Sequence, residues 1–376
     1  MAEYLTNTTD LTKVASAIRE KGGTSDSLVY PDGFVSAIKA IQTGTELQII
    51  VTVTSGATVT ATKGSLSVSG TSVNGTCTLT VPEPGTWSVS ATLGGQTSET
   101  KTVSITGSYA VAILLVSSTL NNNDWSAIKS VSDAGQGANY WSIGDRKAVT
   151  LNGTVGALTL SNYTTYAFII GFNHNASVEG ANRIHFQLAK TALSGGKDVC
   201  LCDKSYDSTV STTGYFSINS SRTNSGGWKS SQMRTKICGT SLSSYSGTII
   251  AVIPAALRSV LKSVTKYTDN TGGGSSAASA VTATTDYFFL LSEFEVFGSR
   301  KYANSNEKSK QAQYAYYSAG NSKIKYKHDG TSTAAYWWLR TPNAATSTGF
   351  AYVDTGGTVN ADGAYYSLGF APGFCV

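Results

Sequence analysis

The stretch that decides the fold closes the sequence. Residues 336–376 read YWWLRTPNAATSTGFAYVDTGGTVNADGAYYSLGFAPGFCV. Apolar and aromatic residues recur through it as a stiff framework: Trp337, Trp338, Leu339, Phe350, Val353, Val359, Phe370 and Phe374. Between them lie small, polar or tyrosine residues. Tyrosine offers a large amphipathic contact area at low entropic cost, and small polar residues adapt to a partner. The pattern is typical of a recognition surface and does not resemble the acid, base or nucleophile of an enzyme.

The exchangeable positions of this segment are the predicted ligand-binding residues. We expect Trp338, Tyr352, Tyr365 and Tyr366 to supply most of the binding energy, because aromatic residues dominate interface hot spots. The whole predicted set is Trp338, Asn343, Ala344, Ala345, Thr346, Ser347, Thr348, Tyr352, Asp354, Thr355, Asn360, Ala361, Asp362, Tyr365, Tyr366 and Ser367.

Composition limits the classes of protein that fit. The chain has 376 residues, enough for two or three domains, and a net charge of +5 that is spread along the sequence. Without a dense basic run, a nucleic-acid partner is not expected. No apolar run reaches the length of a membrane helix, so no membrane insertion is expected. The N-terminus lacks the pattern of a signal peptide, which predicts synthesis in a cytoplasm, a bacterial one by the resemblance described below. The five cysteines are few and scattered, so we expect them reduced and mostly buried.

The sequence divides into three regions of different pattern. Residues 1–44 predict two short helices that attach to a partner chain or cap the next domain, because apolar residues recur at i, i+3, i+4 and i+7. Residues 45–107 predict an all-β, immunoglobulin-like sandwich that acts as a spacer, because apolar residues alternate between turn signals. Residues 108–376 predict an α+β domain whose last part, about 337–376, carries the exchangeable positions; the resemblance described below implies that this part is a variable region.

Within the large domain, several elements are expected. Strands are predicted for residues 109–116, 147–151, 165–172, 183–188 and 248–253. A helix is predicted for residues 255–266, where Leu257, Val260, Leu261 and Val264 share one face. A second, short helix is predicted for residues 292–297.

Several motifs occur in the order found in a known family. They are YWSIGDRKAVTLNG (140–153), GWKSSQMRTKIC (227–238), and FLLSEFEVFG, QAQYAYYSAGNSKIKY and WWLR within residues 289–340. Together they resemble the C-type-lectin-like domain of bacteriophage and prophage tail proteins from gut Gram-positive bacteria. The ending GFAPGFC (369–375) is similar to the GVRPA-type ending of that family and departs from it at Phe370 and Gly373. The N-terminal LTKVASAIREKGG and LVYPDGFVSAIKAI are similar to a helical segment of phage tail proteins.

The resemblance implies a function. Many members of this family are the variable proteins of diversity-generating retroelements, in which Asn codons of a C-terminal segment are diversified. It therefore implies a phage tail adhesin in the virion that binds a host-cell-surface protein or glycan. The resemblance also implies a homo-oligomer, a trimer as in many tail fibres, and contacts to other tail proteins through the N-terminus. A serine-, threonine- and tyrosine-rich β protein without diversification is the alternative explanation of the composition.

The sequence contains few candidate catalytic or metal-binding residues. Asp354 and Asp362 are the only acids among the last forty residues, too few for calcium-mediated sugar binding. Cys200 and Cys202 would lie on one face of a strand, as in the reactive pair of formylglycine-generating enzymes, which share the fold family. The histidines His174, His185 and His328 are far apart in sequence. We expect no catalytic residues, no metal and no cofactor. The alternatives are a formylglycine-generating or glycan-modifying enzyme, and a purely structural tail protein.

Overall fold

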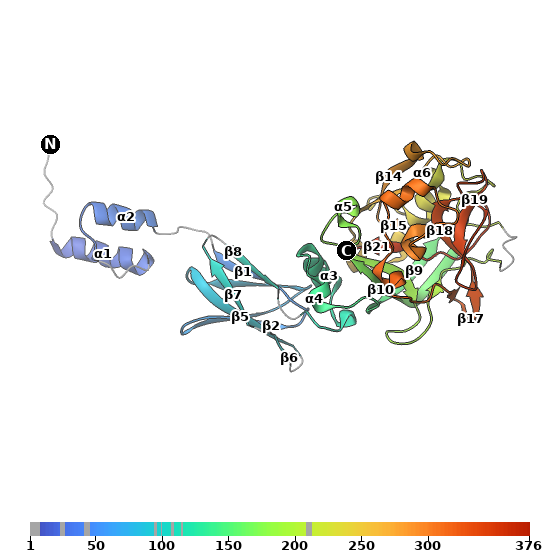
Figure 1. Ribbon diagram of the computed structural model, residues 1–376. Helices are drawn as coiled ribbons and strands as arrows, with labels where there is room; N and C mark the ends of the chain where they lie inside the picture. Colours follow the sequence, from blue (N-terminus) through green and yellow to red (C-terminus); the bar gives the residue numbers. More distant parts are fainter. Residues whose placement is uncertain are drawn as a thin grey trace.

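The computed structural model describes residues 8–22, 27–40, 46–93, 96–98, 100–106, 109–113, 116–207 and 213–376. Three units follow one another in chain order: a pair of helices, a small β unit and a large mixed unit (Figure 1). Strand is more abundant than helix, which confirms the expected multidomain, β-rich fold.

The first unit is a helical hairpin. Helix α1 (Thr8–Gly22) packs against α2 (Asp32–Ala40) through Ala15, Ile18 and Phe34. The predicted helical periodicity is confirmed, but the contact is small, and Val14 and Ile38 remain 47% and 53% exposed. The hairpin therefore leaves apolar side chains uncovered.

The second unit is a two-sheet β sandwich. One sheet has the strand order β4-β1-β8 and the other the order β3-β2-β5-β6, with β7 added against β5. In β1, β2, β4, β5 and β7 buried side chains alternate with more exposed ones, so both sheets contribute to one core around the fully buried Trp87. The strands are β1 (Leu47–Thr52), β2 (Thr58–Lys63), β3 (Leu66–Thr71), β4 (Thr76–Val81), β5 (Gly85–Leu93), β6 (Gln96–Thr97), β7 (Lys101–Ile105) and β8 (Tyr109–Ile113).

Strand β8 corrects the expected boundary between the sandwich and the large unit. Residues 109–116 were expected to open the large domain, but Tyr109–Ile113 pairs in parallel with β1. This pairing places the strand in the sandwich and moves the boundary beyond Ile113. Beyond it, the Ser55 backbone N–H donates to Asp124 at 3.2 Å, so the sandwich also contacts the large unit directly.

The large unit surrounds one continuous hydrophobic core with several small sheets. Its widest sheet has the order β15-β21-β11-β10-β9, and further sheets are β12-β16-β17, β13-β14 and β18-β19-β20. The strands are β9 (Arg146–Val155), β10 (Leu158–Phe172), β11 (Ile184–Lys190), β12 (Val199–Cys200), β13 (Val264–Asp269), β14 (Val281–Asp286), β15 (Phe288–Phe289), β16 (Lys325–Lys327), β17 (Gly330–Ala335), β18 (Trp337–Pro342), β19 (Gly349–Val353), β20 (Val359–Gly363) and β21 (Gly373–Cys375).

Short helices connect these sheets. They are η1 (Leu120–Asn122), α3 (Trp125–Asp133), α4 (Gly137–Tyr140), α5 (Ala176–Glu179), α6 (Gly227–Ser230), the π-helix η2 (Met233–Cys238), α7 (Ile249–Val252), α8 (Ala255–Arg258), η3 (Ala278–Ala280), α9 (Glu293–Phe297), η4 (Ser305–Ser309) and α10 (Ala315–Ser318). Helix α9 confirms the predicted short helix, and Ser292 and Glu295 form a capping box at its start. Within the described ranges, no helix has the length and apolar character needed to cross a membrane.

Two expected elements of the large unit are wrong. Residues 255–266 do not form one helix: α8 ends at Arg258 and Val264 opens strand β13, whose pairing with β14 overrides the helical spacing. Residues 248–253 are helical in α7 rather than a strand. In the first case strand pairing outweighed the local helical pattern.

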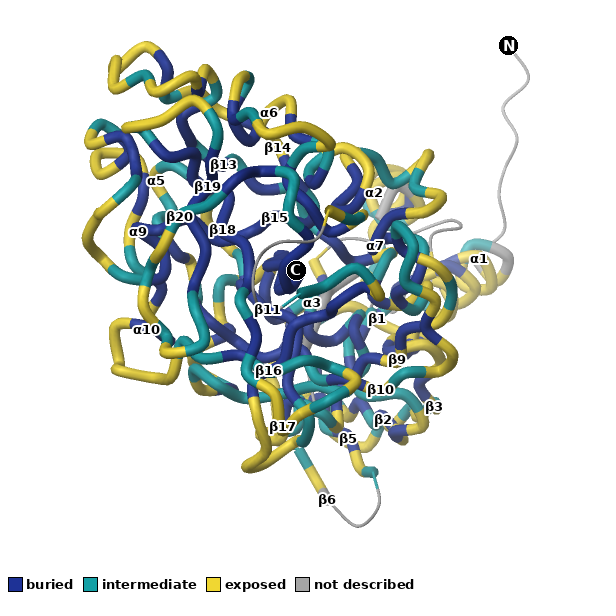
Figure 2. The backbone as a smooth tube through the Cα atoms, turned by 90° about the vertical axis from the view of Figure 1, so that its right-hand side faces the viewer, coloured by how far each residue is buried: buried dark blue, intermediate teal, exposed yellow. Residues whose placement is uncertain are grey.

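The end of the chain lies inside this unit. Strand β21 pairs with β11 on one side and β15 on the other, and Val376 exchanges backbone hydrogen bonds with Ile184. Figure 2 shows buried backbone beside the C-terminus, and Val376 itself is fully buried. The predicted recognition segment is therefore held by the core at its final residues.

Candidate functional site

The predicted recognition segment forms a three-stranded antiparallel sheet and its loops. Strands β18 and β19 pair with Trp337 opposite Val353 and Trp338 opposite Tyr352, and β19 pairs with β20. Every residue of β18 and β19 is buried. Side chains available to a ligand therefore lie in the connecting loops and on β20, residues 343–348 and 354–367, which we call the loop surface.

The structure separates the predicted ligand-binding residues into three groups. Ala345, Thr346, Ser347 and Asn360 are exposed. Partly exposed are Ala344, Thr348, Asp354, Thr355, Ala361, Asp362, Tyr365 and Tyr366. Four are buried: Trp338, Asn343, Tyr352 and Ser367, with exposed fractions of 0%, 8%, 5% and 1%.

The four buried residues support the loop surface instead of contacting a ligand. Trp338 donates its indole Nε1–H to the Tyr366 carbonyl at 3.3 Å and lies edge-to-face against Tyr352. Tyr352 in turn packs on Tyr336, with ring centroids 5.4 Å apart. The prediction that Trp338 and Tyr352 are binding hot spots is therefore corrected, because their rings are already covered by the protein.

Asn224 holds the loop between β18 and β19. Its side-chain amide is fully buried and donates to the carbonyls of Asn343, Thr346 and Gly349 at 3.1, 2.8 and 3.0 Å. Its side-chain oxygen accepts from the Gly273 N–H at 2.8 Å. One residue thereby satisfies several backbone groups of a loop without regular structure. Sequence reasoning missed Asn224, which lies in a Ser- and Gly-rich stretch that carries no motif.

Asp203 plays the same part for the loop after β20. Its carboxylate accepts from the backbone N–H groups of Ser205, Tyr215 and Phe216 and from the Ser367 hydroxyl. The last of these bonds, 2.8 Å long, explains why Ser367 is buried. Asp203 was also missed, because its partners lie up to 164 residues away in sequence.

Tyr365 and Tyr366 form the aromatic part of the loop surface. Their ring centroids lie 4.2 Å apart, and the Tyr365 hydroxyl donates to the Tyr366 hydroxyl at 2.8 Å. Both rings remain partly exposed, and Tyr366 forms a β-bridge to Thr213. The pair is thus an accessible aromatic patch that its own hydrogen bond and ring contact hold in place.

The acids of the loop surface are engaged within it. Asp354 accepts from the N–H groups of Gly356 and Thr358 and from the Thr358 hydroxyl. Burial opposes ionisation here, but these hydrogen bonds lower the pKa of Asp354 below its usual value. Its role in the structure is to close the β19–β20 turn.

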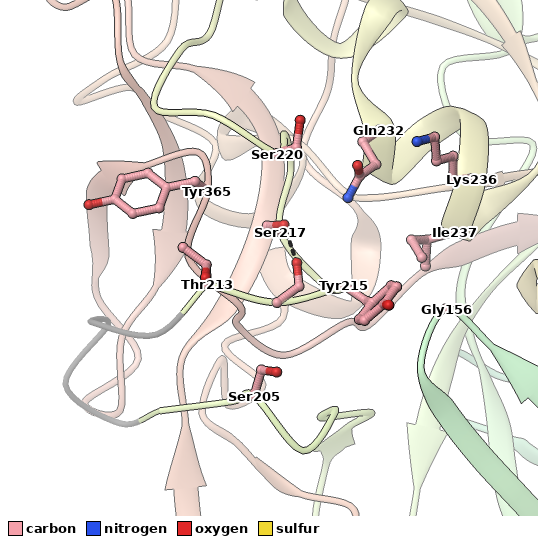
Figure 3. A pocket seen from close by; sticks show the side chains of 11 residues that line it. Gly156, Ser205, Thr213, Tyr215, Ser217, Ser220, Gln232, Lys236, Ile237 and Tyr365 are labelled. Atoms are coloured by element: carbon pink, nitrogen blue, oxygen red, sulfur yellow. Dashed lines mark hydrogen bonds between the residues drawn. The ribbon is translucent and has the colours of Figure 1, made fainter.

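A pocket of about 570 Å³ opens beside Tyr365 (Figure 3). Gln232 and Lys236 lie on one side of it and Tyr365 lies on the other (Figure 3). Hydroxyl, amide and ammonium groups line it, contributed among others by Ser205, Thr213, Tyr215, Ser220, Gln232 and Lys236. Among the described residues, the lining contains no carboxylate. The volume lies within the range of small-molecule sites.

A buried cluster of charges lies deeper in the unit. The Lys266 ammonium is 2.6 Å from Glu179 Oε2, 2.9 Å from Glu295 Oε1 and 2.8 Å from the Tyr314 hydroxyl. Arg340 binds Glu295 through both of its terminal nitrogens. Lys266, Glu295 and Arg340 have no more than 1% exposure and Glu179 has 3%. The cluster joins α5, β13, α9 and β18, so it fixes the sheet that carries the loop surface.

Two histidines adjoin this cluster. His174 and His185, distant in sequence, lie with ring centroids 5.6 Å apart, and His174 stacks on Tyr314. Their Nε2 atoms have no hydrogen-bonding partner among the described residues. Burial lowers the pKa of His174 to about 3 and that of His185 well below its usual value. Burial also raises the pKa of Glu179 to about 7.

Ligand atoms of His174, Glu179 and Glu295 all lie within 4.8 Å of one another, a spacing that could hold a metal ion. The Lys266 ammonium, however, already contacts both carboxylates. It supplies the positive charge that a metal would bring, so the geometry fits a structural ion cluster better than a metal centre.

The structure brings Cys200 and Cys202 together, as their spacing predicted. Their sulfurs are 3.8 Å apart, and the Cys202 N–H donates to His328 Nδ1 at 3.2 Å. Both thiols are buried, and the neighbouring Cys200 thiol and burial raise the pKa of Cys202. A raised pKa disfavours the thiolate that a reactive cysteine requires.

Comparison with known proteins finds one similarity. A family model described as "Domain of unknown function (DUF6273)" matches residues 204–376. This stretch contains β18, β19, β20, the loop surface and Asn224. No curated protein and no solved structure matches the chain. The match places the similarity on the part of the chain with the candidate site and carries no activity with it.

Proposed function

We propose that the chain is a phage or prophage tail-tip adhesin that binds a host-cell-surface protein or glycan non-covalently through the loop surface. The observation that carries this proposal is the division of the C-terminal segment. Its framework residues other than the partly buried Val359 are buried, whereas Ala344–Thr348, Asn360 and the Tyr365–Tyr366 pair are accessible. Accessible tyrosines beside small polar residues are what binding surfaces use.

The proposal also assigns a fold family to each of the two β-containing units. The large unit is a C-type-lectin-like domain, and the small β unit is an immunoglobulin-like spacer. The uncovered apolar side chains of the helical hairpin, Val14 and Ile38 among them, support attachment to another tail protein or to further copies of the chain, as a trimer. Three copies would convert weak single-site binding into avidity.

A double variant tests the binding role. Tyr365→Ala/Tyr366→Ala removes the accessible aromatic pair while leaving the buried framework intact. We expect it to lose host-cell binding in a fluorescence pull-down and to keep its melting temperature within a few degrees. Tyr245→Ala, a partly buried tyrosine that lies outside the loop surface and packs on Arg258, is the control that should keep binding. Undiminished binding of the double variant would refute the assignment.

Sequencing of the gene's 3′ end across a bacterial population tests diversification. Codons for accessible residues such as Thr346, Ser347 and Tyr365 should vary, whereas those for Trp338 and Ser367 should stay constant because both side chains are buried. A uniform 3′ end would leave a fixed adhesin without a retroelement.

A further inference from the structure

The pocket beside Tyr365 has features of a saccharide site. No hydrogen bond to another described residue uses the side-chain polar atoms of Ser205, Ser220, Gln232 or Lys236. Hydroxyl and amide groups both donate and accept, which is what the hydroxyls of a sugar require. Tyr215, 53% exposed, and Tyr365 add two partly exposed aromatic rings to this polar lining.

The backbone around the pocket is specialised for it. Gln232 directly precedes the π-helix η2 and Lys236 lies within it, and π-helices are rare elements that are frequent at functional sites. On the opposite chain segment, Gly156 turns with φ +57°, and a Cβ there would lie 2.9 Å from Ile237 Cδ1. Glycine therefore lets the β9–β10 turn approach η2 closely beside the pocket.

The positive charge at the pocket indicates which class of sugar would bind there. Lys236 is the one charged side chain of the described lining. Outside it, Arg222 lies beside Gly363, where an added Cβ would be 3.2 Å from Arg222 Cγ, and it brings a second positive charge near Tyr366. An ammonium that has no carboxylate partner among the described residues favours an anionic group on the ligand.

Resting on the proposed function, we infer that this pocket binds one acidic sugar residue of a host-cell-surface glycan. Lys236 contacts the sugar carboxylate, Gln232 and Ser220 bind hydroxyls, and Tyr365 connects the pocket to the loop surface. The loop surface then selects the remainder of the ligand, so diversification would change the context in which one acidic residue is recognised.

Calorimetric titration of the full chain with D-glucuronic acid and with D-glucose tests the inference. A ligand of this size is expected to bind with a Kd of about 1 mM. Glucose, which lacks the carboxylate, should bind at least about fivefold more weakly. Lys236→Gln should weaken the binding of glucuronic acid to the affinity of glucose. Lys229 is an exposed lysine of α6 outside the pocket, so Lys229→Gln should change the affinity of neither sugar.

A variant that blocks the pocket tests whether the sugars bind inside it. Ser220→Tyr fills the pocket from an exposed position and should abolish binding of both sugars while the melting temperature is kept. Equal affinity for the two sugars, or no effect of Lys236→Gln, would overturn the acidic specificity, and absence of any heat would overturn the pocket. Host-cell binding measured on the same sample distinguishes failure of the sugar site from failure of the adhesin proposal. If the protein binds cells but no sugar, only the sugar site is refuted. If it binds the sugar but no cells, only the adhesin proposal is refuted.

Discussion

Replacing Lys266 with methionine should destabilise the large unit strongly. Methionine keeps most of the side-chain volume but removes the ammonium that lies 2.6 Å from Glu179 and 2.9 Å from Glu295. Arg340 still neutralises Glu295. Among the basic side chains that the structure describes, Glu179 keeps only His174 and His185 within 4 Å, and burial holds both of these neutral at pH 7. Breaking a buried ion pair at one partner costs about 3–5 kcal/mol where the remaining group stays charged, so we expect a loss of that size in the free energy of unfolding at alkaline pH. At pH 7 the loss should be smaller, because burial already raises the pKa of Glu179 to about 7 and the carboxylate takes up a proton once the ammonium is gone.

Guanidinium unfolding followed by tryptophan fluorescence measures this loss. All of the six tryptophans except Trp87 lie in the large unit, so the signal reports on that unit. Adding Glu179→Gln to Lys266→Met removes the buried carboxyl that has lost its ammonium partner and should recover part of the stability. Lys129→Met breaks an exposed pair with Asp133 and, as a matched control, should cost less than about 1 kcal/mol. A loss below about 1 kcal/mol in Lys266→Met at alkaline pH, or no recovery in the double variant, would refute the account of the cluster.

Three further predictions concern the support of the site. Asn224→Ala removes the amide that binds three loop carbonyls and should cost about 2–4 kcal/mol in chemical denaturation, whereas exposed Asn360→Ala should cost less than about 1 kcal/mol; similar losses would contradict the role of Asn224. His174 has a folded pKa of about 3 against 6.5 for the free side chain, so the unfolded chain takes up a proton that the folded chain does not, and stability falls as pH drops from 6.5 toward 3. His174→Phe should reduce that slope by about 1.4 kcal/mol per pH unit, and an unchanged slope would count against a neutral, buried His174. The five cysteines are buried and should react with Ellman's reagent only after unfolding, so rapid reaction of the native protein would contradict their inert role.

Strand alternation was the most dependable signal in this sequence. In the small β unit, apolar residues at every second position correctly predicted strands such as Leu47–Thr52, because one face of each sheet meets the core. The short helix predicted for residues 292–297 likewise forms as α9, and Ser292 caps its start through a local interaction. These elements depend on neighbours in sequence, and the sequence therefore reveals them.

Strand β13 shows where such signals end. Its inward positions are Val264, Lys266 and Thr268, so a buried lysine interrupts the apolar alternation. Lys266 can be buried only because Glu179 and Glu295 reach it from 87 and 29 residues away. Without those partners in view, the helical spacing of Leu257, Val260 and Val264 was the stronger local pattern. The helix predicted for residues 255–266 is therefore wrong because an ion cluster formed by residues distant in sequence allows Lys266 to be buried in a strand.

The candidate site was limited in the same way. The sequence marked the segment between Asn343 and Ser367, but it could not separate the tyrosines that face solvent from the one that packs inward. Tyr352 lies on β19, a strand buried on both faces, whereas Tyr365 and Tyr366 follow the last strand of the sheet. That distinction depends on which sheet the core covers.

The support of the loop surface explains how it could tolerate change. The backbone of residues 343–349 is bound by Asn224, and Ser367 is bound by Asp203, so both loops depend on side chains outside the exchangeable segment. Replacing an accessible residue such as Thr346 removes little of this bonding, because its backbone carbonyl, not its side chain, contacts Asn224. Stability is thereby supplied by residues that a ligand never reaches, and the side chains that a ligand does reach are left free to differ.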